Sequence, residues 1–439
     1  MPSRRSDPGE GEVKSNAALL GWFYLVIFLL SVIGLVNVYS ATFYMNMENG
    51  MSPYYHAARH AAYLAAGVAG LLVCYKLPLP VIRRWKGALT VPIFFLFALV
   101  IVAGPVINGA QRWVQIGPLS LQPSELAKVV SILWAAACLT DRVEAGRPVS
   151  FLAGCMHYLF HQPFHGHIQK WTDVADGYVP LLIPAAFAAI VILQPDMGTA
   201  ALILGFPIFL YVLCGTPWSD VLWSGILALL GLFILAYIEP YRWERVMVLF
   251  DPFRYASDQG YQVVQSLIAV GSGGLTGQGA GEGLSKFLYL PEQYTDFAFA
   301  VLSQEGGFLA SGFVLTLFVC LLYLGFVMAG RIPRLYPALV VYGLSMLIAV
   351  EGFLNMAMVV GIFPVTGVPL PFISFGGTSL VTNLCAAGLI GNAVRYGERA
   401  RAQDERKRKL AALAGEPVSL RKLSGAVFQP PPSPWERNH

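Results

Sequence analysis

The chain has 439 residues, of which 56% are hydrophobic and 12% are charged, and its net charge at pH 7 is +4. A soluble globular domain carries about twice that fraction of charged residues, so the mean hydropathy of +0.60 excludes an ordinary water-soluble protein. Hydrophobic runs of about 18 residues or more can cross a bilayer as helices. The sequence has many such runs and lacks the alternating segments of about ten residues that a β-barrel needs. It therefore predicts an all-α, polytopic membrane protein.

The hydrophobic runs predict about ten transmembrane helices, with a large, polar, glycine-rich loop at 239–298 between the seventh and the eighth. An even number of spans places both termini on one side of the membrane. Most of the 29 Lys and Arg residues then fall on that side, which the positive-inside rule assigns to the cytoplasm. The expected spans lie near 18–41, 59–76, 88–106, 124–140, 179–194, 198–214, 221–238, 299–329, 336–363 and 374–394.

The sequence divides into a polar cytoplasmic tail at 1–17, a membrane domain at 18–394 and a basic, proline-rich cytoplasmic tail at 395–439. The last tail begins as a charged stretch that can be helical and carries RKRK at 406–409. Basic residues next to a membrane orient the protein and attract anionic lipids. We therefore expect contact with the membrane surface and no binding of nucleic acid.

A long cytoplasmic loop is predicted at 141–178, between the fourth and fifth spans. In a helix, His157, His161 and His165 would share one face, as metal ligands can. Pro163 would interrupt that helix, and aromatic residues lie between the histidines. An amphipathic surface segment against lipid is therefore favoured, with metal binding as the alternative.

Asp296, in the stretch YLPEQYTDF, is the strongest candidate for chemistry, because it lies where the eighth span begins. At the boundary between water and hydrocarbon, burial raises the pKa of a carboxyl group and nearby cations lower it, which can suit a general base. The alternative is a structural role, because Thr295 and Asp296 are both good helix N-caps. The residues themselves favour the two interpretations equally.

Charged residues elsewhere predict a site for an anionic ligand. Glu125 and Lys128 are three apart, hence on one helix face, inside an apolar span where an unpaired charge is costly. They could form a salt bridge that fixes the fourth span, or Lys128 could face a cavity and bind phosphate. Arg112, Arg242 and Arg245 add cations on the external side, where positive charge is otherwise sparse. The alternative is that one or two of these arginines pair with Glu244 or Asp251.

Other polar residues have structural explanations beside the functional ones. Asp196 lies in LQPDMGTA, a tight connection between the fifth and sixth spans, where turn chemistry accounts for much of the pattern. Glu351 and Asn355 share a face of the ninth span and are expected to line a cavity or to bond across helices. The glycine-rich stretch at 271–283 lacks the context of a nucleotide-binding loop, so a closely packed loop is the better explanation.

Four segments that combine Gly or Pro with polar residues are predicted on the external side. Non-helical backbone of this kind is tolerated near a membrane only when it is packed in protein or lines a water-filled cavity. Their motifs resemble those of the SEDS family (shape, elongation, division and sporulation), which includes FtsW, RodA and SpoVE. The matches follow the family order between about residues 20 and 395. They are NGAQRW with LQPSELAK, LQPDMGTA, GYQVVQSLIAVGSGGLTGQG, YLPEQYTDF and PVTGVPLPFISFGGTSL.

The resemblance implies a peptidoglycan glycosyltransferase that polymerises lipid II, a disaccharide-pentapeptide on undecaprenyl pyrophosphate, at the outer face of the bacterial cytoplasmic membrane. It assigns the catalytic carboxylate to Asp296 and places Glu125 and Lys128 near the donor pyrophosphate, with Arg245 at the start of the same loop as Asp296. A lipid II flippase is the main alternative. The motif GYQVVQSLIA favours a member that acts in cell division over one that acts in elongation.

The resemblance also implies partners and a cofactor. A class B penicillin-binding protein, which is a transpeptidase, is the expected partner, together with other divisome or elongasome proteins. A divalent cation, Mg or Mn, is the expected cofactor, and no organic cofactor is expected. The chain departs from the family at Gln304 and Glu305, where two consecutive acids are usual, and at Glu351, where an uncharged polar residue is expected.

Overall fold

The computed structural model describes residues 8–106, 110–117, 119–147, 149, 171–257, 260–283 and 290–413, most of which are helical. Its helices are α1 (Pro8–Glu48), α2 (Tyr55–Lys76), α3 (Leu79–Arg84), α4 (Lys86–Ala103), α5 (Pro123–Glu144), α7 (Trp171–Leu193), α8 (Met197–Leu213), α9 (Trp218–Ile238), α10 (Pro240–Phe250), α11 (Tyr261–Ser272), α12 (Ala298–Gly330), α13 (Leu335–Val359) and α14 (Gly377–Leu413). The strands are β1 (Val114–Ile116) and β2 (Leu119–Leu121).

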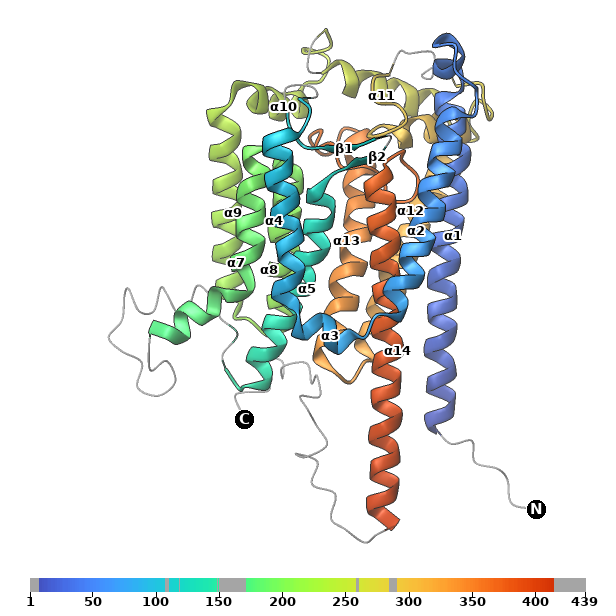
Figure 1. The fold of residues 1–439 in the computed structure, drawn as a ribbon. Helices are drawn as coiled ribbons and strands as arrows, with labels where there is room; N and C mark the ends of the chain where they lie inside the picture. The colour runs from blue at the N-terminus through green and yellow to red at the C-terminus, as the bar shows by residue number, and fades with distance from the viewer. Residues whose placement is uncertain are drawn as a thin grey trace, which may run out of the picture.

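A bundle of long helices forms the body of the molecule (Figure 1). Within the described residues, six helices are long and apolar enough to cross a membrane, namely most of α1 and α14 and all of α2, α4, α12 and α13. Shorter apolar stretches lie in α7, α8 and α9, at the fifth to seventh predicted spans. A multi-pass, helical membrane protein is thereby confirmed, whereas the number of ten spans stays a prediction.

The centre of the bundle is α13, which packs against α12, α14, α5 and α8. Of the apolar stretch with which α13 can span the membrane, 72% is buried within the protein, whereas the corresponding stretch of α2 is only 17% buried. Because α13 is apolar all round and enclosed by protein, it belongs to the core of the bundle. By contrast, α2 exposes much of its surface to the bilayer. Side chains of α13 therefore meet residues from several other elements, which is how its polar residues come to organise the site.

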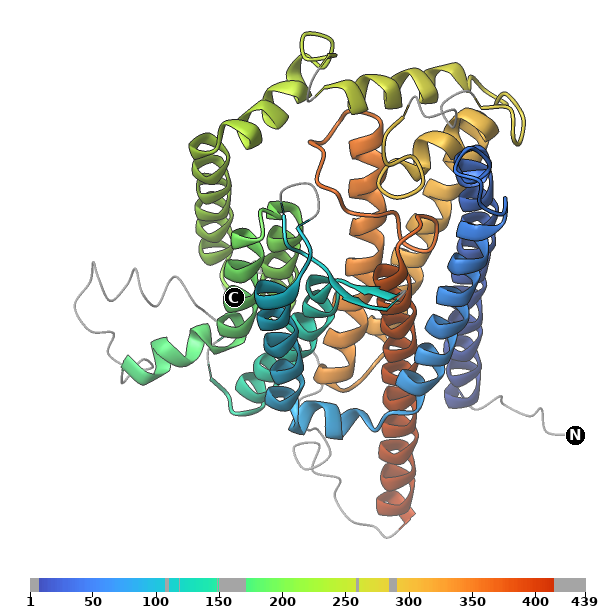
Figure 2. The ribbon, with the colours of Figure 1, turned by 45° about the horizontal axis from the view of Figure 1, so that its top comes forward.

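Short elements cover one end of the bundle, which we call the outer end because the charge pattern predicts that it faces outward. There α10 and α11 run from α9 towards α12 (Figure 2), so the 239–298 segment is partly helical and not only a loop. The strands β1 and β2 form a small antiparallel hairpin with Gly117 in its turn, at a φ of 61°. This hairpin is an addition to the predicted all-α fold.

At the opposite, inner end, α1 begins and α14 ends (Figure 1). The helical part of the C-terminal region confirms that residues after 395 begin as a helix. The predicted loop at 141–178 is shorter than expected, because α5 continues to Glu144 and α7 begins at Trp171. Its histidines, His157 to His167, lie outside the described residues.

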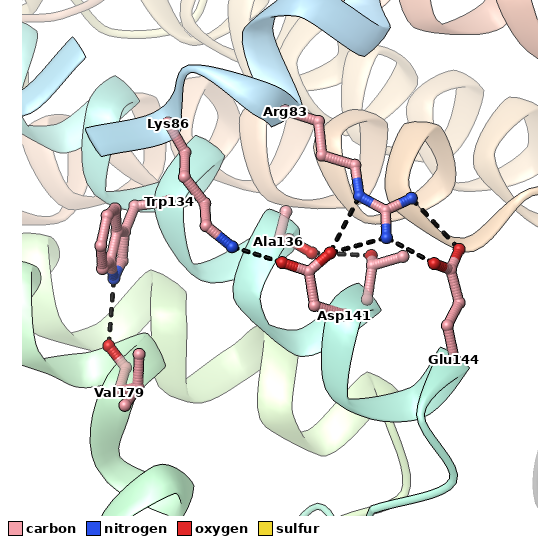
Figure 3. Close-up of polar contacts among 8 residues, drawn as sticks. Arg83, Lys86, Trp134, Ala136, Asp141, Glu144 and Val179 are labelled. Atoms are coloured by element: carbon pink, nitrogen blue, oxygen red, sulfur yellow. Dashed lines mark hydrogen bonds and ion pairs between the residues drawn. The ribbon is translucent and has the colours of Figure 1, made fainter. Parts of the chain in front are cut away.

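Ion pairs fix the inner end (Figure 3). Arg83 of α3 donates to Asp141 of α5, at 2.7 Å between Nη2 and Oδ1, and to Glu144 at 2.5 Å. Lys86, at the start of α4, also pairs with Asp141. Two cations on the α3–α4 connection thus meet two carboxylates in the last turns of α5, which holds these three helices together.

Candidate functional site

The candidate site lies at the outer end, where Asp296 occupies the turn that leads into α12. The N-cap of α12 is Phe297, and no side-chain hydrogen bond caps this helix. The capping interpretation of Asp296 is therefore wrong. Thr295 does not cap α12 either, because its hydroxyl donates to the carboxylate of Glu292 at 2.6 Å.

The turn that carries Asp296 is held through its backbone. Asn355 of α13 donates from Nδ2 to the carbonyl of Asp296 at 2.7 Å and to the carbonyl of Val368 at 2.8 Å. A Cβ atom on Gly367, which has a φ of +71°, would lie 3.6 Å from Oδ2 of Asp296. The buried amide of Asn355 thus joins two external segments and leaves the carboxylate of Asp296 beside a glycine.

The electrostatic surroundings tune Asp296. Burial raises its pKa to about 7, and the negative charges of Glu292 and Asp196 act in the same direction, whereas Arg245 and Arg112 oppose them. Among the described residues, no hydrogen bond or ion pair engages the carboxylate itself. A carboxyl group with a pKa near 7 can both accept and release a proton at neutral pH.

Arg112 connects two external segments. Its Nε donates to the carbonyl of Gln194 at 2.9 Å and its Nη2 to the carbonyl of Pro195 at 2.5 Å. The next residue, Asp196, caps α8, because its carboxylate accepts from the backbone N–H of Thr199 at 3.0 Å and from the hydroxyl of the same residue at 2.9 Å. The turn role predicted for Asp196 is confirmed, and its part in substrate binding stays a prediction.

Arg245 of α10 approaches from another direction. Its Nη1 donates to the carbonyl of Val365, in the segment that follows α13, at 3.1 Å. Arg242 lies on the same helix, but its side chain is outside the described part. The structure thus brings Arg112, Arg245 and Asp196 within electrostatic range of Asp296, as the external motifs predicted.

Glu125 and Lys128 form a separate, buried cluster. Lys128 Nζ donates to Oε1 of Glu125 at 2.8 Å and also to the carboxylate of Glu351 on α13. Glu351 in turn accepts from Nδ2 of Asn383 on α14 at 3.3 Å. The side chains of Lys128, Glu125 and Glu351 are only 1–4% exposed. The salt-bridge interpretation is confirmed, and a contact of Lys128 with phosphate stays a prediction.

The two clusters share α13. Glu351 and Asn355 are four residues apart, hence about one turn apart on one face, and they bond to the Lys128 cluster and to the Asp296 turn respectively. Bonding across helices was predicted for both residues and is confirmed for Glu351, which reaches α5 and α14, whereas Asn355 bonds to a turn and a loop. The connection of Asn355 to Asp296 was not predicted, although its position on the polar face of an apolar span was a signal that it serves the site.

A ready-made metal site is absent from the part of the chain that the structure describes, since no group of three or more His, Cys, Asp or Glu side chains there could hold a metal ion. The carboxylates of Asp296, Glu292 and Asp196 influence one another without forming such a group. The described residues therefore do not fit a preformed divalent-cation centre, and the expected Mg or Mn stays a prediction.

Known proteins resemble this chain in sequence. The "Probable peptidoglycan glycosyltransferase FtsW" of Geobacter sp. (strain M18) is 33% identical over 367 residues, which cover 83% of this chain and 93% of that protein. The "Stage V sporulation protein E" of Bacillus subtilis (strain 168) is 34% identical over 376 residues, which cover 85% of this chain and 96% of that protein.

Solved structures resemble it in fold. One is a chain from work described as "Structural coordination of polymerization and crosslinking by a peptidoglycan synthase complex", with a TM-score of 0.66, 26% identity and coverage of 85% of this chain and 97% of that one. Another is the rod shape determining protein RodA of Thermus thermophilus, with a TM-score of 0.59, 26% identity and coverage of 85% and 95%. The family model of the FtsW, RodA and SpoVE proteins, described as "Cell cycle protein", matches residues 21–399. The chain belongs to this family.

Proposed function

We propose that this chain is a peptidoglycan glycosyltransferase that polymerises lipid II at the outer face of the cytoplasmic membrane. One observation carries the proposal: Asp296 presents a carboxyl group with a pKa raised to about 7, next to two arginines and with its backbone held by α13. A base of this strength suits proton removal from a sugar hydroxyl at neutral pH. The names of FtsW relatives at 33% identity support the same chemistry.

In the proposed reaction, Asp296 accepts the proton of the acceptor sugar's 4-hydroxyl as that oxygen attacks the anomeric carbon of the donor. The bond between the anomeric carbon and the pyrophosphate oxygen breaks, and undecaprenyl diphosphate leaves with the bonding electrons. A single displacement inverts the configuration at the anomeric carbon. The positive charges of Arg112 and Arg245 stabilise the departing pyrophosphate, and Arg242 on the same helix as Arg245 is proposed to help.

The guanidinium of Arg112 is oriented by the two carbonyls that it contacts, so it acts mainly as a fixed positive charge near Asp296. We assign Glu125 and Lys128 to the floor of the site. Lys128 pairs there with both Glu125 and Glu351, and its bond to Glu351 fixes α5 against α13.

For the partner we propose a class B penicillin-binding protein with transpeptidase activity, within the division machinery. The similarity to a chain of a peptidoglycan synthase complex supports a partner of this kind, and the FtsW and sporulation relatives favour division over elongation. Both termini are proposed to be cytoplasmic, in keeping with the beginning of α1 and the end of α14 at the same end of the bundle (Figure 1).

The test is polymerisation of fluorescent lipid II by the purified full-length protein, with and without its transpeptidase partner, comparing wild type with Asp296→Ala. We expect glycan strands from the wild type and none above background from Asp296→Ala. The matched control is Asp251→Ala, which removes another external carboxylate, one that accepts only from the backbone of Arg254 in the described structure. Vesicles in which the wild type moved lipid II across the bilayer without polymerising it would instead support the flippase.

A further inference from the structure

Helix α12 is broken near its outer end. Gly307 has φ 67° and ψ −165°, which is not helical, so residues 298–306 form a short segment separate from the rest of α12. We call residues 298–306 the outer segment. Asp296 lies two residues before it, and the outer segment therefore carries the proposed catalytic base.

Residues 273–279, which we call the glycine strap, are bonded into this break. Backbone groups that a continuous helix would pair internally are instead satisfied by the strap, as buried backbone groups must be. The four hydrogen bonds are Gln278 N–H to Gln304 O at 3.0 Å, Gly279 N–H to Glu305 O at 3.1 Å, Phe308 N–H to Gly274 O at 2.9 Å and Leu309 N–H to Leu275 O at 3.2 Å.

The contact is too close for side chains at two positions of the strap. A Cβ atom on Gly273 would lie 2.1 Å from the carbonyl oxygen of Ser303, and one on Gly277 would lie 2.0 Å from that of Glu305. Both obstacles are backbone atoms of the outer segment, which cannot rotate away. By contrast, a Cβ atom on Gly271 or Gly274 would meet no atom within 4 Å.

The outer segment is also held at its other faces. Asn37 of α1 donates to the carbonyl of Ala298 at 3.0 Å, and Ser40 of α1 donates to the carboxylate of Glu305 at 2.6 Å. Asn355 holds the carbonyl of Asp296. A helical segment of this length is stiff, so a shift at residue 304 reaches Asp296 about 12 Å away, at 1.5 Å per residue.

We propose that Gly273 and Gly277 are positioning residues for Asp296: their close backbone contact with the outer segment sets where the carboxylate lies. The proposal rests on the proposed function, in which Asp296 is the base. Because the strap touches only the backbone of the outer segment at these two points, it acts through the placement of Asp296 and not through contact with the substrate.

Two matched pairs of variants of the full-length protein test this. Gly273→Ala is compared with Gly271→Ala, because neither glycine has a positive φ. Only a Cβ atom at position 273 would meet α12. Gly277→Ala is compared with Gly274→Ala, since both have positive φ, +83° and +55°, and only a Cβ atom at position 277 would meet α12. A displacement of about 1 Å can lower a rate about 100-fold. We therefore expect kcat for lipid II polymerisation to fall about 10- to 100-fold in Gly273→Ala and Gly277→Ala, with KM nearly unchanged. Both controls should remain near wild type.

The pH dependence supplies a readout that loss of folded protein would not change. Asp296 faces Glu292, Asp196, Arg112 and Arg245, and burial is the largest cause of its raised pKa. A displacement of the outer segment changes the burial of Asp296. The acid limb of the rate profile should therefore move in Gly273→Ala and Gly277→Ala, and stay in place in Gly271→Ala and Gly274→Ala.

Gly283→Ala keeps the test decisive where Gly277→Ala fails to fold. Its Cβ atom would meet Oε1 of Gln304 at 2.8 Å and Cγ of Glu305 at 3.1 Å. Both are side-chain atoms that can move, so we expect a smaller fall in kcat with the same direction of pH shift. Equal kcat and equal pH profiles in the clashing variants and their controls would overturn the inference.

Asp296→Asn in the same assay separates two kinds of failure. An inactive Asp296→Asn together with unaffected strap variants would overturn the positioning role alone. A fully active Asp296→Asn would overturn the proposed role of Asp296, and the positioning role with it.

Discussion

The two charged clusters on the polar face of α13 differ in what their charges contact. In the buried cluster, Lys128 is paired with both Glu125 and Glu351, and all three are almost fully enclosed. At the outer end, the carboxylate of Asp296 has no paired cation among the described residues. Arg112 and Arg245, which lower its pKa, donate to backbone carbonyls.

The difference indicates which cluster is suited to chemistry. An ion pair without access to water holds its protons and positions fixed, which stabilises helix packing. The partly buried carboxyl group of Asp296, which forms no ion pair with a described cation, has a pKa raised to about 7 and can exchange a proton. We therefore attribute stability to the Lys128 cluster and catalysis to Asp296, and variants of each cluster can test the distinction.

The largest effect on stability is expected for Lys128→Met, which leaves Glu125 and Glu351 buried without their cation. Breaking a buried ion pair from one side costs about 3–5 kcal/mol. The thermal unfolding midpoint of the purified protein in detergent should fall far more than in Lys86→Met, whose pair with Asp141 is partly exposed. Equal midpoints for the two variants would show that the buried cluster does not stabilise the bundle.

The next largest effect is expected for Asn355→Ala, because it leaves the carbonyls of Asp296 and Val368 without their hydrogen-bond donor. Each buried group left without a partner costs about 1–3 kcal/mol. The matched control is Asn383→Ala, which removes a buried amide from the Lys128 cluster instead. At equal amounts of folded protein, lipid II polymerisation should fall in Asn355→Ala and remain near wild type in Asn383→Ala. A fall of the same size in both would remove the functional distinction between the clusters.

Arg112→Gln should have a smaller effect that depends on pH. Arg112 lowers the pKa of Asp296, so its loss raises that pKa further above 7 and leaves less of the ionised base at neutral pH. The rate should fall several-fold at pH 7, because a change of one unit in pKa corresponds to about tenfold in the ionised fraction, and should recover in part at pH 9. A profile with the wild-type midpoint would contradict this role.

The smallest effect is expected at the inner end, for Arg83→Gln. Its guanidinium is 28% exposed and its partner Asp141 is 47% exposed, and ion pairs that reach water contribute less than about 1 kcal/mol each. Unfolding should shift by a few degrees at most, and lipid II polymerisation should not change. A loss of polymerisation would show that the packing of α3 on α5 is coupled to the outer end.

The sequence predicted what depends on local composition. Uninterrupted apolar runs identified the positions of the membrane helices, and the spacing of Glu125 and Lys128 predicted their salt bridge. It also drew attention to Asp296, because an acid between a polar loop and an apolar span has few explanations. The close packing expected for the glycine-rich stretch at 271–283 is confirmed at Gly273 and Gly277.

Features that depend on tertiary contact were not predictable from the sequence. The eighth span was expected to be continuous, and its break at Gly307 exists because the glycine strap supplies the missing backbone partners. The second partner of Lys128 is Glu351, more than 200 residues away in the sequence. The capping role considered for Asp296 failed because α12 begins one residue later than an Asp296 cap would require, with Phe297 at its N-cap.

The most direct test of the central claim, that Asp296 is the base, is the initial rate of lipid II polymerisation by wild type and Asp296→Asn between pH 5 and pH 9. The carboxylate form is required, so the wild-type rate should rise with pH through a midpoint near 7, and Asp296→Asn should stay at background at every pH. A wild-type rate in Asp296→Asn at any of these pH values would contradict the claim.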